Sequence, residues 1–152
     1  MNERPGPAVP ADLPAIIDLL EEAGLPTEDL DSASLAAFAV VRATGDESLL
    51  AAGALEIYGL DGLLRSIVVA PGCRGTGIGG RLTRHLIAQA HESALSSIWL
   101  LTTTASDYFP DFGFRKRARA EAPPAIAGTP EFARLCPDSA ACLALELSDE
   151  QA

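Results

Sequence analysis

The chain has 152 residues, 48% of them hydrophobic, a length that suits a single domain with one sizeable core. Its net charge is −10, with 11 Lys and Arg against 21 Asp and Glu, so it lacks the basic excess that nucleic-acid binding requires. Glycine and proline are scattered, which argues against a disordered or fibrous protein. We therefore expect a globular domain whose acidic surface mainly provides solubility.

The cysteines and the N-terminal residues indicate a reducing compartment. Cys73, Cys136 and Cys142 are odd in number and form no CxxC pair, so we interpret them as reduced thiols and expect no disulfide and no metal. Residues 1–10 contain no apolar run, and no stretch reaches the roughly 18 apolar residues of a membrane span. The cytoplasm is the expected location, with neither nucleic acid nor membrane as a partner.

The first predicted element is an amphipathic helix. Asp12 is a candidate N-cap, apolar residues recur at helical spacing from Leu13 to Ala23, and Gly24 is expected to end the helix. Pro14 suits its first turn. Residues 26–36 are polar and predict a short helix and a loop.

Three predicted strands follow, the last two joined by a tight turn at residues 59–62. The third is apolar after Arg65, so we expect it at the centre of a sheet. The order αβββαβα…β predicts a mixed sheet with helices on both faces, and one domain over residues 1–152. The strands are expected at 38–42, 49–58, 63–70, 97–101 and 140–147. The later helices are expected at 78–90 and at 105–112, the second being short and broken or tightened near Pro110.

A glycine-rich stretch between the central strand and the long helix carries the strongest chemical signal. It follows Pro71 and contains Gly75, Gly77, Gly79 and Gly80. Because the first N–H groups of a helix lack partners and glycine lets the backbone curl around an anion, this junction predicts a pyrophosphate site; a turn without a ligand is the alternative. No Lys-Ser or Lys-Thr occurs for a P-loop, and no acidic residue stands where a dinucleotide fingerprint needs one.

These residues resemble a known family. The pattern R-x-x-G-x-G at Arg74, Gly77 and Gly79, after V-V-A-P, resembles the acetyl-CoA motif of the GNAT acetyltransferases, and ASDYFPDFGF at 105–114 is similar to their A-x-x-F-Y-x-x-x-G-F segment. The resemblance extends to the order of elements over nearly the whole chain. It implies the α/β GNAT fold, a mixed central sheet flanked by helices with two strands splayed at the cofactor, and an N-acetyltransferase that uses acetyl-CoA as co-substrate.

The resemblance also implies roles for individual residues. The main chain of Ile67, Val68 and Val69 would pair with the pantetheine arm, and an N–H near Val68 or Val69 would polarise the thioester oxygen. Thr102 stands where many relatives have an asparagine that touches the cofactor. Loop amides would hold the pyrophosphate, with Arg74 adding charge; these loop residues are Gly75, Thr76, Gly77, Ile78, Gly79 and Gly80.

The chain departs from the family at Phe109. Most members have a tyrosine there, which protonates the leaving thiolate, whereas Tyr108 of this chain lies one residue earlier. Phenylalanine cannot donate a proton, so we expect no general acid at 109. Such help is worth about 10²–10⁴-fold, so its loss need not abolish catalysis, and solvent would protonate the thiolate.

Other segments resemble the arsenic-resistance-associated N-acetyltransferases, which acetylate arsinothricin and phosphinothricin. They lie mostly outside the cofactor motif and therefore bear on the substrate, which would be a glutamate-like amino acid whose α-amine attacks acetyl-CoA directly in a ternary complex. The matching segments are 53–59, 63–66, 99–105 and 129–140.

Five residues are candidates for binding and activating that substrate. Arg65 could grip its carboxylate or oxyanion, or could form a salt bridge to Glu56 across the hairpin. Ser66, Thr103 and Thr104 could supply hydroxyl groups, although the threonines could instead cap the following helix. Glu56 is the candidate base for the α-ammonium, or else it pairs with Arg65 or faces solvent.

Two other functions stay open. One is acetylation of another small amine. Acetylation of protein N-termini is less expected. The other is an acetyl-CoA sensor without activity, which the absence of tyrosine at 109 favours. A homodimer is common among relatives, and the sequence leaves the oligomeric state open.

Overall fold

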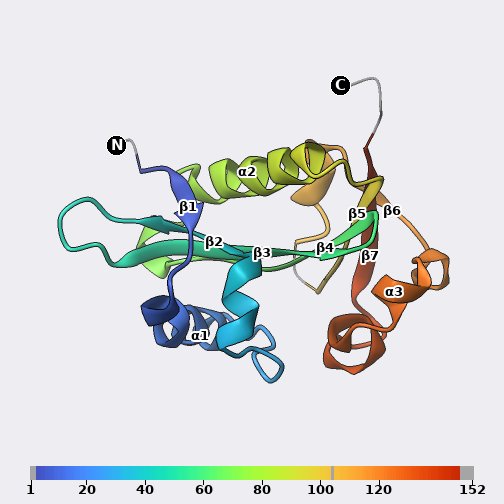
Figure 1. Ribbon diagram of the computed structural model, residues 1–152, viewed down its shortest axis with the longest axis horizontal. Helices are drawn as coiled ribbons and strands as arrows, with labels where there is room; N and C mark the ends of the chain where they lie inside the picture. Colours follow the sequence, from blue (N-terminus) through green and yellow to red (C-terminus); the bar gives the residue numbers. More distant parts are fainter. Residues whose placement is uncertain (1–2, 104, 148–152) are drawn as a thin grey trace. The chain divides into compact units, whose positions relative to one another are not determined.

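The computed structural model describes residues 3–103 and 105–147 (Figure 1). Short 3₁₀ turns lie between the main elements, and a π-helical turn spans Glu131–Leu135. The helices and strands are β1 Pro5–Pro7, α1 Leu13–Glu22, β2 Phe38–Arg42, β3 Leu49–Tyr58, β4 Asp61–Val69, α2 Ile78–Glu92, β5 Ser97–Thr102, β6 Arg115–Lys116, α3 Pro124–Ala127 and β7 Ala141–Glu146.

The described strands form a mixed sheet, as predicted. They pair in the order β1-β2-β3-β4-β5-β7-β6, which places β4 at the centre. β4 and β5 run parallel, whereas β2–β3 and β5–β7 are antiparallel. The β4–β5 ladder runs only from Asp61–Ser97 to Leu63–Trp99, while β5 stays paired with β7 as far as Thr102. Within the described residues the two parallel strands therefore part after Leu63, as the resemblance implied.

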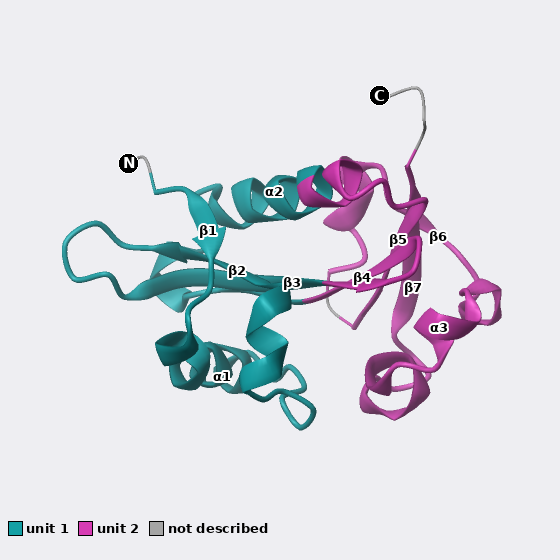
Figure 2. Cartoon of the chain, in the orientation of Figure 1, with its two compact units in different colours: residues 1–55, 66–88 teal, residues 56–65, 89–152 magenta. Residues whose placement is uncertain are grey.

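Contacts between residues divide the chain into two compact units (Figure 2). Unit 1 comprises residues 1–55 and 66–88, and unit 2 comprises residues 56–65 and 89–152. The elements β3, β4 and α2 each run through both units. One domain over residues 1–152 stays a prediction.

The core of unit 1 lies between α1 and the strands that it covers. Buried Ile16 and Leu20 of α1 pack with Phe38, Val40 and other apolar side chains of β2, β3 and β4. The opposite face of the strands meets α2, because a Cβ at Gly53 would lie 3.3 Å from both Leu82 and Leu86. Successive strand residues point to opposite faces, and each buried Leu or Ile contributes about 1.5–3 kcal/mol.

Asp12 stands at the start of α1, but its side chain does not cap the helix. One carboxylate oxygen accepts the Val9 N–H at 2.8 Å, and the group pairs with Arg42 of β2. The capping role was therefore a wrong prediction, since the carboxylate finds a charged partner on the sheet. Gly24 follows the helix with φ of 76°, a left-handed conformation that suits glycine, as predicted.

The core of unit 2 gathers around β4, β5 and β7. Leu63, Trp99 and Ala144 are buried against Ile126 and Phe132, which follow β6 in the chain. The Trp99 indole N–H donates to the Ser97 hydroxyl at 2.9 Å, and that hydroxyl donates to Asp61 at 2.7 Å. The polar end of the buried tryptophan is thereby satisfied.

The region after β5 differs from the prediction. The helix expected at 105–112 is reduced to a 3₁₀ turn, Phe109–Phe112, which Gly113 ends with φ of 101°; the tightening near Pro110 was expected, but the helical residues before it were not found. Pro110 lacks an N–H and cannot extend a helical ladder. β1, β6 and α3 were not predicted, because elements of two to four residues contain no readable apolar period.

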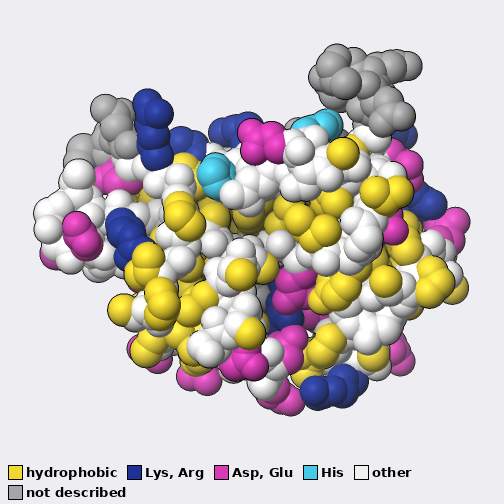
Figure 3. Space-filling view, viewed as in Figure 1, with side chains coloured by type: hydrophobic (Ala, Val, Ile, Leu, Met, Phe, Trp, Pro, Cys, Tyr) yellow, Lys and Arg dark blue, Asp and Glu magenta, His cyan; other side chains and the backbone are white. Residues whose placement is uncertain are grey.

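The surface view shows acidic side chains spread among basic and apolar ones on the visible face (Figure 3). No helix of the described residues is long and apolar enough to cross a membrane.

Candidate functional site

The glycine-rich stretch forms a tight exposed loop in unit 1. After β4, Pro71–Cys73 makes a 3₁₀ turn, and Gly75 and Gly77 then adopt φ of 82° and 86°. Residues with a side chain rarely adopt such angles, so both positions require glycine. The Thr76 hydroxyl donates to the carbonyl of Cys73 and closes the turn.

The loop leads directly into α2, whose first amides are available to a ligand. The Arg81 N–H donates to the carbonyl of Gly77 at 3.1 Å, so the amides of Ile78, Gly79 and Gly80 precede the helical ladder. The Arg81 guanidinium lies 3.9 Å from the place where a Gly77 side chain would begin. Partial charge from the helix and full charge from arginine therefore favour an anion here.

Arg74 is engaged elsewhere in unit 1. Its Nε donates to the carbonyl of Val69 at 3.2 Å, and its NH2 lies 3.3 Å from Glu22 Oε1. Both side chains of this ion pair are half exposed. Exposed pairs of this kind are worth about 0–1 kcal/mol, so a phosphate could replace Glu22 at little cost.

The strand segment expected to pair with pantetheine begins with an unusual backbone. Ser66 has φ of 61°, within β4 and directly before Ile67. A left-handed residue that is not glycine costs about 1–3 kcal/mol and interrupts the regular extended strand. Val68 is buried on the α1 side of the sheet, and the Val69 carbonyl is occupied by Arg74.

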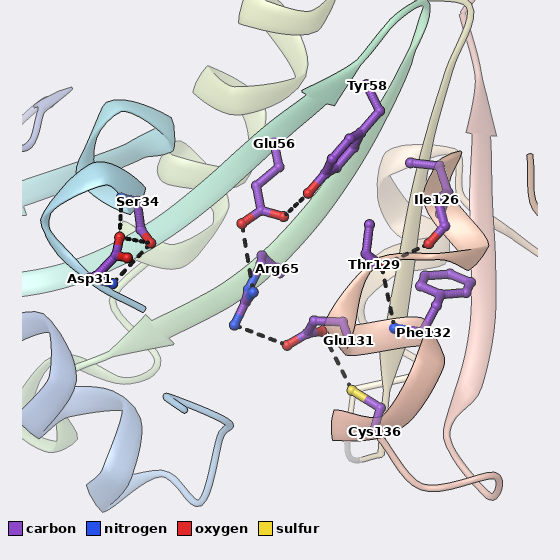
Figure 4. Close-up of polar contacts among 10 residues, drawn as sticks. All are labelled: Asp31, Ser34, Glu56, Tyr58, Arg65, Ile126, Thr129, Glu131, Phe132 and Cys136. Atoms are coloured by element: carbon purple, nitrogen blue, oxygen red, sulfur yellow. Dashed lines mark hydrogen bonds and ion pairs between the residues drawn. The ribbon is translucent and has the colours of Figure 1, made fainter. Parts of the chain in front are cut away.

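A chain of polar contacts crosses unit 2 (Figure 4). Arg65 lies between two carboxylates, with NH1 3.6 Å from Glu56 Oε2 and NH2 3.3 Å from Glu131 Oε2. The Tyr58 hydroxyl donates to Glu56 Oε1 at 2.8 Å. The salt bridge to Glu56, which was the alternative for Arg65, is therefore present, and direct substrate binding by Arg65 stays a prediction.

Tyr58 and Glu131 were missed as members of this cluster. Glu56 and Tyr58 are two residues apart on β3, and this spacing would have placed both side chains on the same face of the sheet. Glu131 lies in the segment 129–140, one of those that resemble the arsenic-resistance-associated enzymes, but nothing in the sequence indicates that its carboxylate pairs with Arg65.

The threonines after β5 are only partly described. The Thr102 hydroxyl accepts the Ala105 N–H at 2.9 Å and so stabilises the turn that follows, which is the capping contact expected as the alternative for these threonines. Thr103 is exposed, and Thr104 lies outside the described residues. Roles for the three threonines in binding stay predictions.

Phe109 is buried and offers no proton donor. Its ring packs edge-on against Phe114 at 5.8 Å and against Tyr108 at 5.1 Å. Tyr108 is the exposed member of this aromatic group. The protonation of the leaving thiolate by solvent stays a prediction.

The cysteines are free thiols, as predicted, and two of them have raised pKa values that lower their reactivity as nucleophiles. Burial, followed by the negative charge of Glu131, raises the pKa of Cys136 to about 12. Burial also raises the pKa of Cys142. Within the described residues no three His, Cys, Asp or Glu side chains could hold a metal ion, and independence of metals stays a prediction.

Comparison with protein families decides the assignment of the chain. The acetyltransferase (GNAT) domain family matches residues 35–116, more than half of the chain. The chain belongs to the GNAT acetyltransferase family. The matched range includes the parting strands, the glycine loop and the start of α2, so the features described above are those of a GNAT domain.

One relative of known sequence is named for the compound that it acetylates. Streptothricin acetyltransferase from Streptomyces lavendulae is 34% identical over 101 residues, which are 64% of this chain and 53% of that protein. This GNAT chain therefore spans about half the length of the relative that it matches.

Solved structures show the same fold. N-acetylglutamate synthase from Neisseria gonorrhoeae, complexed with coenzyme A and N-acetyl-glutamate, has a TM-score of 0.82 at 22% identity, over 97% of this chain and 36% of that one. A Mycobacterium tuberculosis protein complexed with CoA and NLQ has a TM-score of 0.80 at 21% identity, over 95% and 99% of the two chains. The Escherichia coli ribosomal-protein-S18-alanine N-acetyltransferase has a TM-score of 0.70 at 16% identity, with 99% of both chains covered.

Proposed function

We propose that this protein is an acetyl-CoA-dependent N-acetyltransferase that acts on a small-molecule amine. The observation that carries the proposal is the left-handed turn at Gly75 and Gly77, which leads into the first amides of α2, ahead of the bond from Arg81 to Gly77. A pyrophosphate fits such a turn because main-chain N–H groups converge on one anion. Membership of the GNAT family and the CoA complexes among proteins of this fold support the same ligand.

In the proposed reaction the amine attacks the thioester carbonyl directly. Glu56 takes a proton from the substrate ammonium, and the free amine then forms a bond to the carbonyl carbon. A main-chain N–H of Val68 or Val69 stabilises the oxyanion that develops. The attacking nitrogen loses its second proton to solvent and the tetrahedral intermediate collapses by breaking its C–S bond. The CoA thiolate leaves and takes a proton from solvent, because Phe109 has none to give.

The substrate class is the finer part of the proposal. Resemblance to the arsinothricin and phosphinothricin N-acetyltransferases over segments 53–59 and 129–140 supports a glutamate-like amino acid. In that case Arg65, which is fully buried between Glu56 and Glu131, would have to become accessible and exchange a carboxylate partner for the substrate. Ser66, Thr103 and Thr104 would be further donors. The relative named for streptothricin supports a different small amine. A cytoplasmic location and a possible homodimer belong to the same proposal.

A sensor that binds acetyl-CoA without turnover is the second candidate. Buried Phe109 favours it, because the usual position of the proton donor holds a hydrocarbon ring. Release of free thiol from acetyl-CoA in the presence of amines separates an enzyme from a sensor.

The test combines binding and turnover. Acetyl-CoA at about 100 times Kd should stabilise the wild type by about 2.7 kcal/mol and raise its Tm. Gly77→Glu should abolish this rise, because φ of 86° disfavours a side chain and a carboxylate repels the pyrophosphate. Gly45→Glu is the matched control, since Gly45 also has a positive φ (102°) but lies in a turn outside the loop. Thiol release is then measured with phosphinothricin, arsinothricin, glutamate, streptothricin and simple amines.

Each outcome has a definite meaning. Preference for phosphinothricin or arsinothricin supports the glutamate-like class, and turnover of another amine keeps the reaction but replaces the substrate. A rise in Tm without thiol release supports the sensor. Unchanged acetyl-CoA binding in Gly77→Glu would refute the assignment of the loop.

A further inference from the structure

A buried guanidinium shared by two carboxylates carries a further inference (Figure 4). The side chain of Arg65 is 0% exposed, whereas that of Glu56 is 19% exposed and that of Glu131 is 6% exposed. A molecule that reaches this cluster from solvent therefore meets the carboxylate of Glu56 and not the guanidinium. The accessible group is a proton acceptor whose electrostatic surroundings are set by buried neighbours.

Both carboxylates are held in the same way. Each directs one oxygen to Arg65 and the other to a neutral donor, the Tyr58 hydroxyl for Glu56 and the Cys136 thiol for Glu131. The pKa of Cys136 is raised to about 12, so its thiol keeps its proton at assay pH. Both acids therefore share the Arg65 guanidinium, with Glu131 the nearer and the more deeply buried of the two.

The segment that holds Glu131 is firmly attached. Arg119 donates to the carbonyls of Phe132, Cys136 and Pro137 at 2.8–3.1 Å, and the Cys136 N–H donates to the carbonyl of Glu131 at 3.1 Å. Because Arg119 is directed to these carbonyls, it fixes the position of Glu131 instead of replacing Arg65 as the partner of that carboxylate.

We propose that Glu131 is a positioning residue that sets the proton affinity of Glu56 by sharing Arg65, and this rests on the proposed role of Glu56 as the base. A guanidinium that faces a single carboxylate strongly favours its ionised form, and burial strengthens that effect. A carboxylate held in this way is a weak base. When Glu131 shares the same guanidinium, this effect on Glu56 is weaker, which favours the transfer of a proton from the substrate ammonium.

The alternative is that the three charged groups only fasten residues 131–136 to β4. Glu131→Gln would then change stability but would leave the titration of Glu56 unaltered. Tyr58, Cys136 and Arg119, which contact the cluster or the segment that holds Glu131, are unchanged in that variant. A shift in the titration of Glu56 therefore reports the loss of the Glu131 charge.

The test measures Glu56 itself. The ¹³C signal of its side-chain carboxyl carbon is followed against pH by NMR in full-length protein labelled at glutamate, and is identified by its absence in Glu56→Gln. In Glu131→Gln the titration midpoint should fall by about one pH unit. Glu131→Asp, which keeps the charge, should restore most of the wild-type midpoint. Glu121→Gln is the control, because Glu121 is an exposed carboxylate paired with Arg117.

Cys136→Ala is a second variant that tests the proposal if Glu131→Gln fails to fold. Loss of the thiol donor leaves the Glu131 charge less satisfied, so Glu131 draws more strongly on Arg65 and the Glu56 midpoint should rise. A midpoint that stays at its wild-type value in both variants overturns the proposal.

Activity separates this inference from the proposed function. With one amine used throughout, the acid limb of the pH profile of kcat/KM should move by the same amount and in the same direction as the NMR midpoint. A midpoint that moves without the acid limb shows that Glu56 is not the base and overturns the positioning role. If no amine is acetylated but the midpoint moves, the control of Glu56 by Glu131 stands and the proposed function falls.

Discussion

The tight packing at Gly53 predicts a measurable loss of stability when a single methyl group is added. A Cβ at this position would lie 2.4 Å from Ile67 Cδ1, closer than atoms can approach, and 3.3 Å from both Leu82 Cδ2 and Leu86 Cδ1. Ile67 Cδ1 must therefore move, and the two fully buried leucines of α2 must give by a few tenths of an ångström. Overpacking of this kind costs about 1–3 kcal/mol.

The net effect of Gly53→Ala is somewhat smaller. Replacing glycine restricts the unfolded chain and returns about 0.4–1 kcal/mol, so we expect a loss of about 1–2 kcal/mol. In a domain of this size 1 kcal/mol shifts Tm by about 2–4 °C, so Tm should fall by about 2–8 °C. Urea unfolding should give the same loss at an unchanged m-value.

A second substitution tests the cause. Ile67→Val removes Cδ1, the atom that the new methyl group would meet, and alone should cost about 0.5–1.5 kcal/mol. The loss of stability in the double variant should be about 1 kcal/mol smaller than the sum of the losses in the two single variants. Gly72→Ala is the control, since nothing lies within 4 Å of a Cβ there. Additive losses, or a Gly53→Ala variant as stable as the wild type, would refute the packing argument.

Two further predictions concern titratable groups. Hydrogen bonding to Arg42 lowers the pKa of Asp12 in the folded protein, so the pair stabilises the fold at neutral pH and this stabilisation disappears as pH falls through that lowered pKa. Asp12→Asn should lose about 1–3 kcal/mol at pH 7 in urea unfolding, and its difference from the wild type should shrink as pH falls toward that lowered pKa, whereas a constant difference would contradict the linkage. Because the pKa of Cys136 is about 12, its alkylation by iodoacetamide at pH 8 should be over about 100-fold slower in the native than in the urea-unfolded protein by mass spectrometry. Equal rates would show that its thiol is not protected.

Much of the fold was readable from local pattern. The strands at 38–42 and 49–58 match the predicted ranges residue for residue, because apolar runs bounded by turn residues are informative over five to ten positions. The glycine loop was equally readable, since Gly75 and Gly77 adopt the left-handed angles for which glycine is selected. Elements of two to four residues, such as β6, were beyond this kind of reasoning because tertiary contacts alone define them.

The sequence-based prediction was wrong where a charged side chain had both a nearby and a distant interaction partner. Asp12 has the position of an N-cap, and local logic assigned it to the helix that follows. Its carboxylate pairs instead with Arg42, thirty residues further along. A capping bond to a backbone amide is worth about 1 kcal/mol, whereas hydrogen bonds to a charged group are worth about 1.5–3 kcal/mol each. The distant partner prevails because it offers charge.

The same reasoning applies to the proposed catalytic chemistry. An arginine in an apolar strand suggests a grip for an anion, and Glu56 could be foreseen as its partner because a hairpin joins β3 to β4. Glu131 could not be foreseen, since it comes from a segment whose place depends on contacts such as those of Arg119. Yet Glu131 changes the meaning of the cluster. A buried guanidinium with one carboxylate is neutral, whereas with two carboxylates it forms a group of formal charge −1, which is better suited to accept a proton from an ammonium than to bind an anion. If the cluster contacts the substrate, its charge favours the amine as the group presented there, and the carboxylate or oxyanion of a glutamate-like substrate would then need cations from elsewhere in the chain.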